Sequence, residues 1–321
     1  MAKFLITGGS GFIGTNLITK LLKDKHQVVS IDIKEPKFRE HNAIFRMVNL
    51  CNKQELESVI LSYDPAYVIH LAARTDLNGK TLEDYDANIG GVKNLLFVLD
   101  KLKNLKKVIF ASSMYVCEPG YVPKDFNDFT PHTIYGQSKV LTEKNIKDWN
   151  PKYTWTIVRP TSIWGPYFDE PYNLFFKIVL SGKYFHMGSK ACKKTYGYID
   201  NFIYQLQSII TSDKELVNQK VFYLGDYEPY NITSWADEIA GTKNIRIHNI
   251  PYSVFVIAAF FGDCLKLVKI KFPMTSFRLK NMTTNNFFDL SEIKQLAPDL
   301  PVSRNTGTKQ TVDWMVNHYS I

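Results

Sequence analysis

The chain of 321 residues contains few cysteines, and the four that it has lie far apart. They are Cys51, Cys117, Cys192 and Cys264, and no two have the short spacing that is typical of a zinc site or a disulfide framework. We therefore expect free thiols, no metal site and a reducing compartment, the cytoplasm. A strand is predicted from Lys3 onward, which leaves no room for a secretory signal peptide.

Long runs of apolar or of basic residues are also absent. The longest apolar stretch, Val254–Phe261, is too short to cross a bilayer, so we expect no integral membrane segment. The formal net charge is +8, but the lysines are scattered, with short clusters only at 101–107 and 190–194. This distribution does not indicate nucleic-acid binding, and an anionic small ligand is enough to account for it.

What the sequence does have is a glycine-rich turn close to its start. The predicted strand 3–7 runs into Gly8-Gly9-Ser10-Gly11-Phe12-Ile13-Gly14, and a helical pattern of apolar residues follows. Such a turn lets the backbone approach a pyrophosphate, which the free N–H groups of the helix N-terminus can bind. The residues expected to contact a dinucleotide here are Gly8, Gly11, Phe12, Ile13 and Gly14.

An acidic residue at the end of the next predicted strand supports this interpretation. The strand 27–32 ends at Asp32, 18 positions after Gly14. A carboxylate at this place can accept both hydroxyls of an adenosine ribose, and it would repel a 2′-phosphate. The sequence therefore predicts NAD, rather than NADP, as the cofactor.

Strands and helices alternate through the first half of the chain. Further strands are predicted at 44–48, 67–71, 107–111 and 154–159, with helices at 52–61, 83–102 and from 135 onward. This order predicts an α/β fold, a Rossmann-type doubly wound parallel sheet with a smaller, mixed substrate-binding lobe. We assign residues 1–165 to the NAD-binding domain, to which the chain returns near 198–225. Residues 166–197 and 226–321 form the expected lobe.

Two polar motifs follow predicted strands. Ser112 and Ser113 come directly after the strand 107–111, and Tyr135 and Lys139 stand one helical turn apart. A free phenol has a pKa of about 10, which a nearby ammonium and the positive nicotinamide ring can lower. Such a tyrosine can remove the proton of a substrate alcohol while NAD accepts the hydride. We therefore predict Ser113, Tyr135 and Lys139 as catalytic residues.

With these motifs the chain resembles the extended short-chain dehydrogenases/reductases, and within them the nucleotide-sugar epimerase/dehydratase group. The resemblance covers most of residues 3–201. It implies that Tyr135 is the catalytic base, that Lys139 modulates it and binds the nicotinamide ribose, and that Ser113 is the hydroxyl partner. Further matching motifs are His70-Leu71-Ala72-Ala73, Asn88 with Gly91, residues 159–166, and Tyr198-Ile199-Asp200.

The resemblance also implies which residues bind the two ligands. Beyond the glycine-rich turn, the expected cofactor contacts are Asp32, Asn49, Leu50, Leu71, Ala72, Ala73, Asn88, Ser112, Tyr135, Lys139 and Pro160. The expected substrate contacts are Ser113, Thr161 and Lys194, the last at a place where relatives often have an arginine against a diphosphate. The implied partner is a nucleotide sugar, and the implied assembly is a homodimer through helices 83–102 and 135–148.

Departures from the family pattern indicate which of the family's reactions the chain is expected to catalyse. Sugar-nucleotide 4,6-dehydratases carry an acidic pair where this chain has Met114 and Tyr115, so dehydration is disfavoured. Asn49 replaces an aspartate near the adenine, and its amide can still form hydrogen bonds there. Asn201 replaces a second aspartate after the Tyr-Ile-Asp motif, without a consequence that the sequence reveals. His70 stands at a strand end and is predicted to be structural rather than catalytic.

The leading interpretation is an NAD-dependent enzyme of carbohydrate biosynthesis that epimerises a sugar nucleotide through a transient 4-keto intermediate. The same residues permit an NAD(P)H-dependent 4-keto sugar-nucleotide reductase. They also permit a hydroxysteroid-type dehydrogenase, which the apolar segment 254–261 slightly favours. A non-catalytic dinucleotide sensor is the alternative from another class, and the intact Ser113, Tyr135 and Lys139 set argues against it. The segment Ile250–Pro273, with Lys266, Lys269 and Lys271, is interpreted as a packed lobe helix, with contact to a membrane surface as the alternative.

Overall fold

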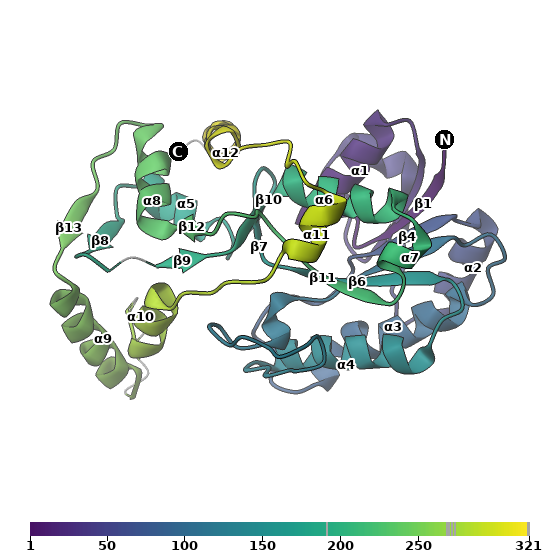
Figure 1. Ribbon diagram of the computed structural model, residues 1–321, viewed down its shortest axis with the longest axis horizontal. Helices are drawn as coiled ribbons and strands as arrows, with labels where there is room; N and C mark the ends of the chain where they lie inside the picture. Colours follow the sequence, from purple (N-terminus) through teal and green to yellow (C-terminus); the bar gives the residue numbers. More distant parts are fainter. Residues whose placement is uncertain (191, 268–269, 271, 273, 320–321) are drawn as a thin grey trace.

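A central parallel sheet organises the computed structural model, which describes residues 1–190, 192–267, 270, 272 and 274–319. In space the strands follow the order β11-β6-β5-β4-β1-β2-β3, and every neighbouring pair is parallel (Figure 1). The strands are β1 (Lys3–Thr7), β2 (Gln27–Asp32), β3 (Phe45–Met47), β4 (Tyr67–His70), β5 (Lys107–Ala111), β6 (Thr154–Pro160) and β11 (Lys220–Leu224). The direction of strand addition reverses between β1 and β4, and doubly wound sheets bind ligands at such a point. The predicted α/β fold is confirmed.

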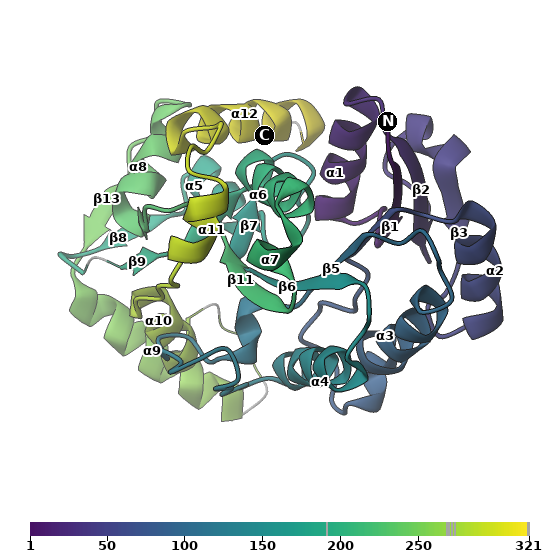
Figure 2. The same cartoon turned by 45° about the vertical axis from the view of Figure 1, so that its right-hand side comes forward.

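Helices cover both faces of this sheet. α1 (Phe12–Lys23) and α6 (Ile199–Thr211) pack together on one face, while α2 (Lys53–Tyr63), α3 (Asp86–Leu99) and α4 (Ile134–Trp149) cover the other (Figure 2). Because both faces are covered, the central strands are largely apolar, and all five residues of β5 are buried. Two hydrophobic cores result, one on each side of the sheet.

The predicted helix 83–102 is shorter and divided. Glu83–Tyr85 form a 3-10 turn, η2, and the α-helix itself begins at Asp86 and ends at Leu99. The carboxylate of Asp84 accepts hydrogen bonds from the amides of Lys80 and Thr81, which holds this turn to the preceding loop. A second 3-10 turn, η3 (Met114–Val116), follows Ser113. A third, η1 (Arg39–Ile44), precedes β3.

The remaining elements form a mixed assembly beside the sheet. Three short strand pairs connect it: β7 (Ser162–Trp164) with β10 (Tyr196–Tyr198), β8 (Phe185–Met187) with β13 (His248–Ile250), and β9 (Lys193–Lys194) with β12 (Tyr230–Asn231). Its helices are α5 (Leu174–Leu180), α8 (Ile232–Gly241), α9 (Tyr252–Leu267), α10 (Ser276–Thr283), α11 (Ser291–Leu296) and α12 (Arg304–Tyr319). The short helix α7 (Lys214–Val217) belongs to the sheet region, where it contacts β6. Aromatic rings fill the interior of the mixed assembly, with Trp164 and Trp235 centred 5.0 Å apart. α9 and α10 lie at the end remote from β1–β3 (Figure 1).

The structure can be compared with the expectations about thiols, membrane segments and metal sites. All four cysteines are free thiols, with Cys117 and Cys192 buried and Cys51 and Cys264 exposed. Within the described ranges, no helix combines the length and apolar character that a membrane span needs. The same residues contain no group of three or more histidine, cysteine or acidic side chains that could hold a metal ion.

A fully buried ion pair joins α4 to the sheet. The guanidinium of Arg159, on β6, donates through Nε and Nη2 to the two carboxylate oxygens of Glu143, each at 2.8 Å. It also donates to the hydroxyl of Tyr223, at 3.0 Å, and to the carbonyl of Phe126, at 2.7 Å. Glu143 lies one turn after Lys139 on α4. The pair therefore fixes the helix that carries the predicted catalytic residues.

We predict that Glu143→Leu destabilises the protein strongly. The change leaves the guanidinium of Arg159 buried without its carboxylate, which costs about 3–5 kcal/mol in the free energy of unfolding. Urea unfolding followed by circular dichroism measures this loss.

The matched control is Glu57→Leu, which removes an acid from the partly exposed Lys101–Glu57 pair, with a nitrogen–oxygen distance of 2.6 Å. This variant should lose less than about 1 kcal/mol, because water screens exposed pairs. Equal losses in the two variants would contradict a specific role for the buried pair.

Candidate active site

The glycine-rich turn brings the ends of β1 and β4 into backbone contact. Gly8 has a φ of +75°, and a Cβ atom on it would lie 2.6 Å from the backbone nitrogen of Ala72. A Cβ on Gly14 would lie 2.2 Å from the carbonyl oxygen of Gly8. Only glycine fits at either position. The amides of Phe12 and Ile13 belong to the first turn of α1, where N–H groups have no intrahelical acceptor and can bind a phosphate.

Asp32 lies beside this turn, as the sequence predicts. One carboxylate oxygen accepts a hydrogen bond from the amide of Ser10 at 3.0 Å, and the other accepts one from the amide of Ile33 at 2.7 Å. These two bonds orient the partly exposed carboxylate next to the loop that would hold the phosphates. The position suits a carboxylate that binds the adenosine ribose.

Asn88 is buried and fixes the backbone that follows β4. Its side-chain oxygen accepts a hydrogen bond from the amide of Arg74 at 2.8 Å, and its nitrogen donates to the Arg74 carbonyl and to the Ser138 hydroxyl, both at 3.0 Å. The segment Leu71–Ala73 lies between this clamp and Gly8. Asn88 therefore positions the expected cofactor-binding segment, and a direct contact with the cofactor stays a prediction.

The other expected cofactor residues lie along the same edge of the sheet. Asn49 is exposed and its side chain accepts a hydrogen bond from the amide of Cys51, whereas Leu50 is buried against Gly91. Pro160 ends β6. Ser112 is buried, and its hydroxyl oxygen has no hydrogen-bond partner among the described residues. A buried unpaired hydroxyl next to a glycine cradle and free helix amides fits a polar dinucleotide.

The three predicted catalytic side chains come together at the end of β5. Ser113 follows the strand, while Tyr135 and Lys139 share the buried side of α4. The ammonium of Lys139 donates to the carbonyl of Ala111 at 2.9 Å. The hydroxyl of Ser113 forms a hydrogen bond with the phenol of Tyr135. The structure thus brings together residues that are up to 26 positions apart in the sequence.

The protein groups alone do not lower the pKa of Tyr135. Burial raises it, the neighbouring Tyr172 raises it further, and only the hydrogen bond with Ser113 acts in the opposite direction. The predicted effect of Lys139 on this phenol, which the sequence analysis coupled to the nicotinamide ring, stays a prediction. The positive charge of a bound nicotinamide ring is the additional group that can stabilise the phenolate.

Burial also lowers the pKa values of Lys139 and His70. It lowers the pKa of Lys139 to about 8, although the carboxylate of Glu143 favours the charged form. Burial, with the charge of Lys139, lowers the pKa of His70 to about 3. The Nδ1 atom of His70 lies 2.7 Å from the hydroxyl of Thr7. His70 is thus a neutral, hydrogen-bonded residue of the core, as predicted.

The sequence analysis did not identify the tyrosines that surround the phenol of Tyr135. The rings of Tyr85 and Tyr115 are centred 6.1 and 6.0 Å from that of Tyr135, and the hydroxyl of Tyr172 is close enough to influence its pKa. Tyr172 belongs to the aromatic-rich segment that follows β7. His132 stacks on Tyr115 with ring centres 5.6 Å apart. No periodic signal in the sequence distinguishes these rings from core residues.

The two expected substrate contacts outside the catalytic set have partners within the protein. The hydroxyl of Thr161 donates to the carbonyl of Leu224 at 2.9 Å. Lys194 is half-buried, and its ammonium donates to the carbonyl of Asn281, on α10, at 2.6 Å. Burial lowers the pKa of Lys194. A contact between either side chain and the substrate stays a prediction.

Asn201 has a structural role that the sequence did not reveal. Its amide nitrogen donates to a carboxylate oxygen of Asp226 at 2.9 Å and to the carbonyl of Val302 at 2.8 Å. Burial raises the pKa of Asp226 to about 6. An aspartate in place of Asn201 would set two acids against each other, so the amide is the compatible residue here.

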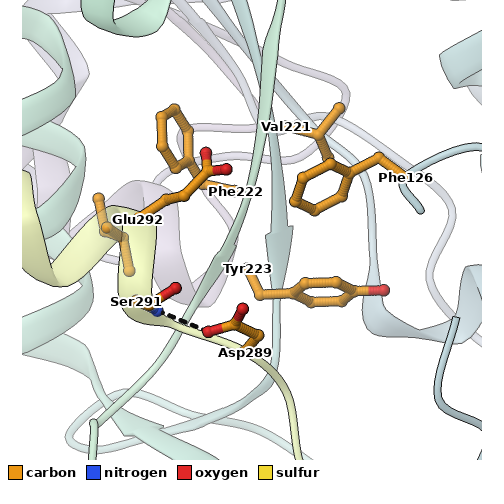
Figure 3. A pocket seen from close by; sticks show the side chains of 8 residues that line it. Phe126, Val221, Phe222, Tyr223, Asp289, Ser291 and Glu292 are labelled. Carbon is orange, nitrogen blue, oxygen red and sulfur yellow. Dashed lines mark hydrogen bonds between the residues drawn. The ribbon is translucent and has the colours of Figure 1, made fainter. Parts of the chain in front are cut away.

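A small pocket lies elsewhere, between the edge strand β11 and α11. The lining residues, most of them labelled in Figure 3, are Phe126, Val221, Phe222, Tyr223, Asp289, Ser291, Glu292 and Ile293. Asp289 accepts a hydrogen bond from the amide of Ser291, at the start of α11. None of the predicted catalytic or ligand-binding residues lines it, so the pocket is separate from the candidate active site.

We predict that His70 makes the protein sensitive to acid. The unfolded chain binds a proton at this residue near pH 6.5, whereas the folded chain does so only near pH 3. Between these values the unfolded state holds more protons, so stability falls as the pH falls. From pH 7.5 to pH 5 the loss from this residue is about 2 kcal/mol.

Urea unfolding at the two pH values measures the loss, and His70→Asn should reduce it by about 2 kcal/mol relative to the unmodified chain. His248→Asn, which changes an exposed histidine, should leave the pH dependence unaltered. An unchanged pH dependence in His70→Asn would refute the assignment.

Comparison with known proteins agrees with this geometry. A model of the NAD dependent epimerase/dehydratase family matches residues 4–221. A putative UDP-glucose 4-epimerase of Methanocaldococcus jannaschii is 32% identical over 98% of each chain. The N-acetyl-alpha-D-glucosaminyl-diphospho-ditrans,octacis-undecaprenol 4-epimerase of Escherichia coli O157:H7 is 24% identical and covers 98% of this chain and 95% of its own.

Solved structures show the same fold. UDP-glucuronic acid 4-epimerase from Bacillus cereus, in complex with NAD, superimposes with a TM-score of 0.77, and the match covers 99% of this chain and 97% of that one at 22% identity. The family model spans the chain from β1 to the start of β11. The chain is an NAD-dependent enzyme of the extended short-chain dehydrogenase/reductase type and belongs to the NAD dependent epimerase/dehydratase family.

Proposed function

We propose that this enzyme epimerises a sugar nucleotide at C4 of the sugar. The observation that carries the proposal is the arrangement of Ser113, Tyr135 and Lys139 at the end of β5, close to the cradle that suits NAD. NAD supplies an acceptor that takes a hydride from C4 and can return it. The relatives that act on C4 of a sugar diphosphate support this choice of substrate class.

The side chains of this enzyme have separate tasks in the reaction. Ser113 holds the C4 oxygen, and Tyr135 takes its proton as the hydride leaves and gives it back as the hydride returns. Lys139, anchored by the Ala111 carbonyl, supplies positive charge beside the phenol and a hydrogen-bond donor for the nicotinamide ribose. The buried position of Tyr135 keeps bulk water away from the transient 4-keto sugar.

The residues after Ser113 favour epimerisation over dehydration. Dehydration needs a carboxylic acid beside the reacting sugar, and Met114 and Tyr115 of η3 cannot provide one. Tyr115 instead packs between the ring of His132 and that of Tyr135. A net reductase or a hydroxysteroid-type dehydrogenase would use the same three catalytic residues, and the stoichiometry of NADH separates these reactions from epimerisation.

Several finer assignments belong to the same proposal. Thr161 and Lys194 are proposed to contact the substrate, with Lys194 close to its diphosphate. Residues 1–165, with the return at 198–225, are proposed as the NAD-binding domain, and 166–197 with 226–321 as the substrate lobe. A homodimer through α3 and α4 and a cytoplasmic location complete the proposal. The partly exposed rings of Phe97 and Trp149 on these helices suit such a contact.

We predict that Tyr135→Phe abolishes turnover and keeps the cofactor. The change removes one hydroxyl without changing the ring, so kcat should fall by about 10²–10⁴-fold. Cofactor released on denaturation, measured by absorbance and mass, should stay at the level of the unmodified enzyme. The control Tyr121→Phe changes a partly exposed loop tyrosine whose hydroxyl donates a hydrogen bond to the carboxylate of Asp128, and it should keep full activity. Full activity in Tyr135→Phe would refute the assigned base.

The substrate class is tested by a panel of UDP-, GDP-, CDP- and dTDP-sugars. Each is incubated with the purified enzyme while absorbance at 340 nm is followed, and the sugars are then separated by chromatography. The proposal predicts that one nucleotide sugar is converted to its C4 epimer with no steady change in absorbance. Steady consumption of added NADH or NADPH with a 4-keto sugar would establish the reductase instead.

A further inference from the structure

Helix α9 presents a stripe of apolar side chains to solvent. Ile257, Phe260, Phe261 and Cys264 stand at helical spacing on one side, and all are exposed. Phe260 is 64% exposed and Phe261 is 58% exposed. Val254, Val256 and Leu267 extend the stripe along the helix. A water-soluble helix normally turns such a stripe toward the core, so its outward orientation requires an explanation.

The opposite side of α9 is fixed against α10, so the helix cannot turn its apolar stripe inward. Ala259 and Gly262 are buried, and a Cβ on Gly262 would lie 1.7 Å from the carbonyl oxygen of Met274. The carboxylate of Asp263 accepts a hydrogen bond from the amide of Ser276, at the start of α10, at 3.2 Å. The outward stripe is therefore a fixed feature of the fold.

The apolar surface continues beyond the helix. Ile270, Phe272 and Phe277 are also exposed, and Phe277 projects from α10 with 66% of its surface accessible. Residues 268–269, 271 and 273, which include two lysines named in the sequence-based alternative, lie outside the described residues. We call the exposed apolar residues of 254–277 the α9 surface. Contiguous apolar surfaces with polar margins mark sites of interaction.

The sequence around the α9 surface is basic. Residues 246–288 contain six lysines and arginines and a single acidic residue, Asp263, whose carboxylate accepts a hydrogen bond from the amide of Ser276. Lys266 and Lys280 are exposed, and the ammonium of Lys190 lies 5.2 Å from the centre of the Tyr252 ring at the start of α9. Aromatic and aliphatic side chains among cations match the boundary between acyl chains and anionic headgroups.

We propose that the α9 surface docks onto an anionic lipid bilayer, with α9 lying in the plane of the interface. Phe260 and Phe261 enter the acyl-chain boundary, while Lys266 and Lys280 bind headgroup phosphates. The helix lies on the membrane and does not cross it. This inference goes beyond the proposed reaction and does not depend on it.

Docking at this surface would bring the substrate lobe close to the bilayer. α10 packs on α9, and the carbonyl of its Asn281 accepts the hydrogen bond from Lys194, the proposed diphosphate contact. The side chain of Asn286, just after α10, accepts a hydrogen bond from the amide of Gly120 at 3.1 Å, which links the surface to the loop before Tyr135.

Flotation of the full-length enzyme with vesicles tests the proposal. One set of vesicles is pure phosphatidylcholine and the other contains about one third phosphatidylglycerol, the anionic lipid that basic residues favour. The unmodified enzyme should float with the anionic vesicles. The double variant Phe260→Ser/Phe261→Ser should bind them at least about tenfold more weakly, because two apolar rings no longer enter the interface.

The matched control changes two exposed apolar residues of the sheet region, Met47→Ser/Leu216→Ser, and should bind like the unmodified enzyme. Lys266→Glu/Lys280→Glu should weaken binding to anionic vesicles by about tenfold or more and leave binding to neutral vesicles unchanged. Retained NAD and an unaltered unfolding temperature show that each variant is folded.

Two results would overturn the proposal. One is an unmodified enzyme that stays with neither kind of vesicle. The other is a phenylalanine double variant that is folded and floats as well as the unmodified enzyme. If the unmodified enzyme does not float but forms a dimer that the same double variant abolishes, the α9 surface contacts a second copy of this chain and not a bilayer. Turnover is measured separately, so loss of vesicle binding with full activity leaves the proposed reaction intact.

Discussion

The close backbone contact between Gly8 and Ala72 is the constraint on which the rest of the site depends. It joins the ends of β1 and β4 at the point where the strand order reverses, and any side chain at Gly8 would push the two segments apart. α1 begins a few residues after Gly8, so its free amides are placed by the same contact. The side chain of Asn88 fixes the segment that contains Ala72, through hydrogen bonds with the amide and the carbonyl of Arg74. The absence of a Cβ atom at Gly8 thus sets the relative positions of the glycine-rich turn and the segment that follows β4.

The proposed catalytic residues Tyr135 and Lys139, and His70 beside Lys139, are buried. Burial opposes charge on Tyr135, Lys139 and His70, and it shifts the pKa of each toward the neutral form. Glu143 moderates this effect on Lys139 while also pairing with Arg159. Without a bound cofactor, burial favours the neutral phenol of Tyr135. In the proposed reaction a positive nicotinamide ring beside the phenol would stabilise the phenolate, so cofactor binding would be coupled to reactivity.

Much of the sheet region could be predicted from the sequence, because its signals are local. Most of these strands are short apolar runs, and β1, β2, β4 and β5 end in a small or polar residue. The glycine spacing between a strand and a helix, with Asp32 at the end of the next strand, predicted the turn. Tyr135 and Lys139 could be paired because helix geometry alone brings them together. The division of the predicted helix 83–102 was missed because it depends on Asp84 binding the amides of a neighbouring loop. Local sequence patterns predict helices and strands well, but they do not reveal which side chains bind segments distant in the sequence.

Contacts between separate segments of the chain show the opposite situation. Tyr85, Tyr115 and Tyr172 come from three separate segments, and only the tertiary structure brings them around Tyr135. Asn201 appeared as a departure from the family, and its purpose became visible only with the buried carboxylate of Asp226 beside it. The apolar segment of α9 was read as a packed helix, yet only its Ala259 and Gly262 side is buried. An apolar sequence does not distinguish a helix face that packs in the core from one that stays exposed to solvent.

The central claim is that a single hydride leaves C4 of the sugar and returns to the same carbon. A nucleotide sugar deuterated at C4, taken from the panel member that reacts, tests this most directly. The account predicts that the C4 epimer retains the deuterium, with none in free NADH and none lost to water, as mass spectrometry of the separated products would show. Deuterium in released NADH, or an unlabelled product, would contradict it, because the hydride would then leave the enzyme and the reaction would be a net oxidation or exchange.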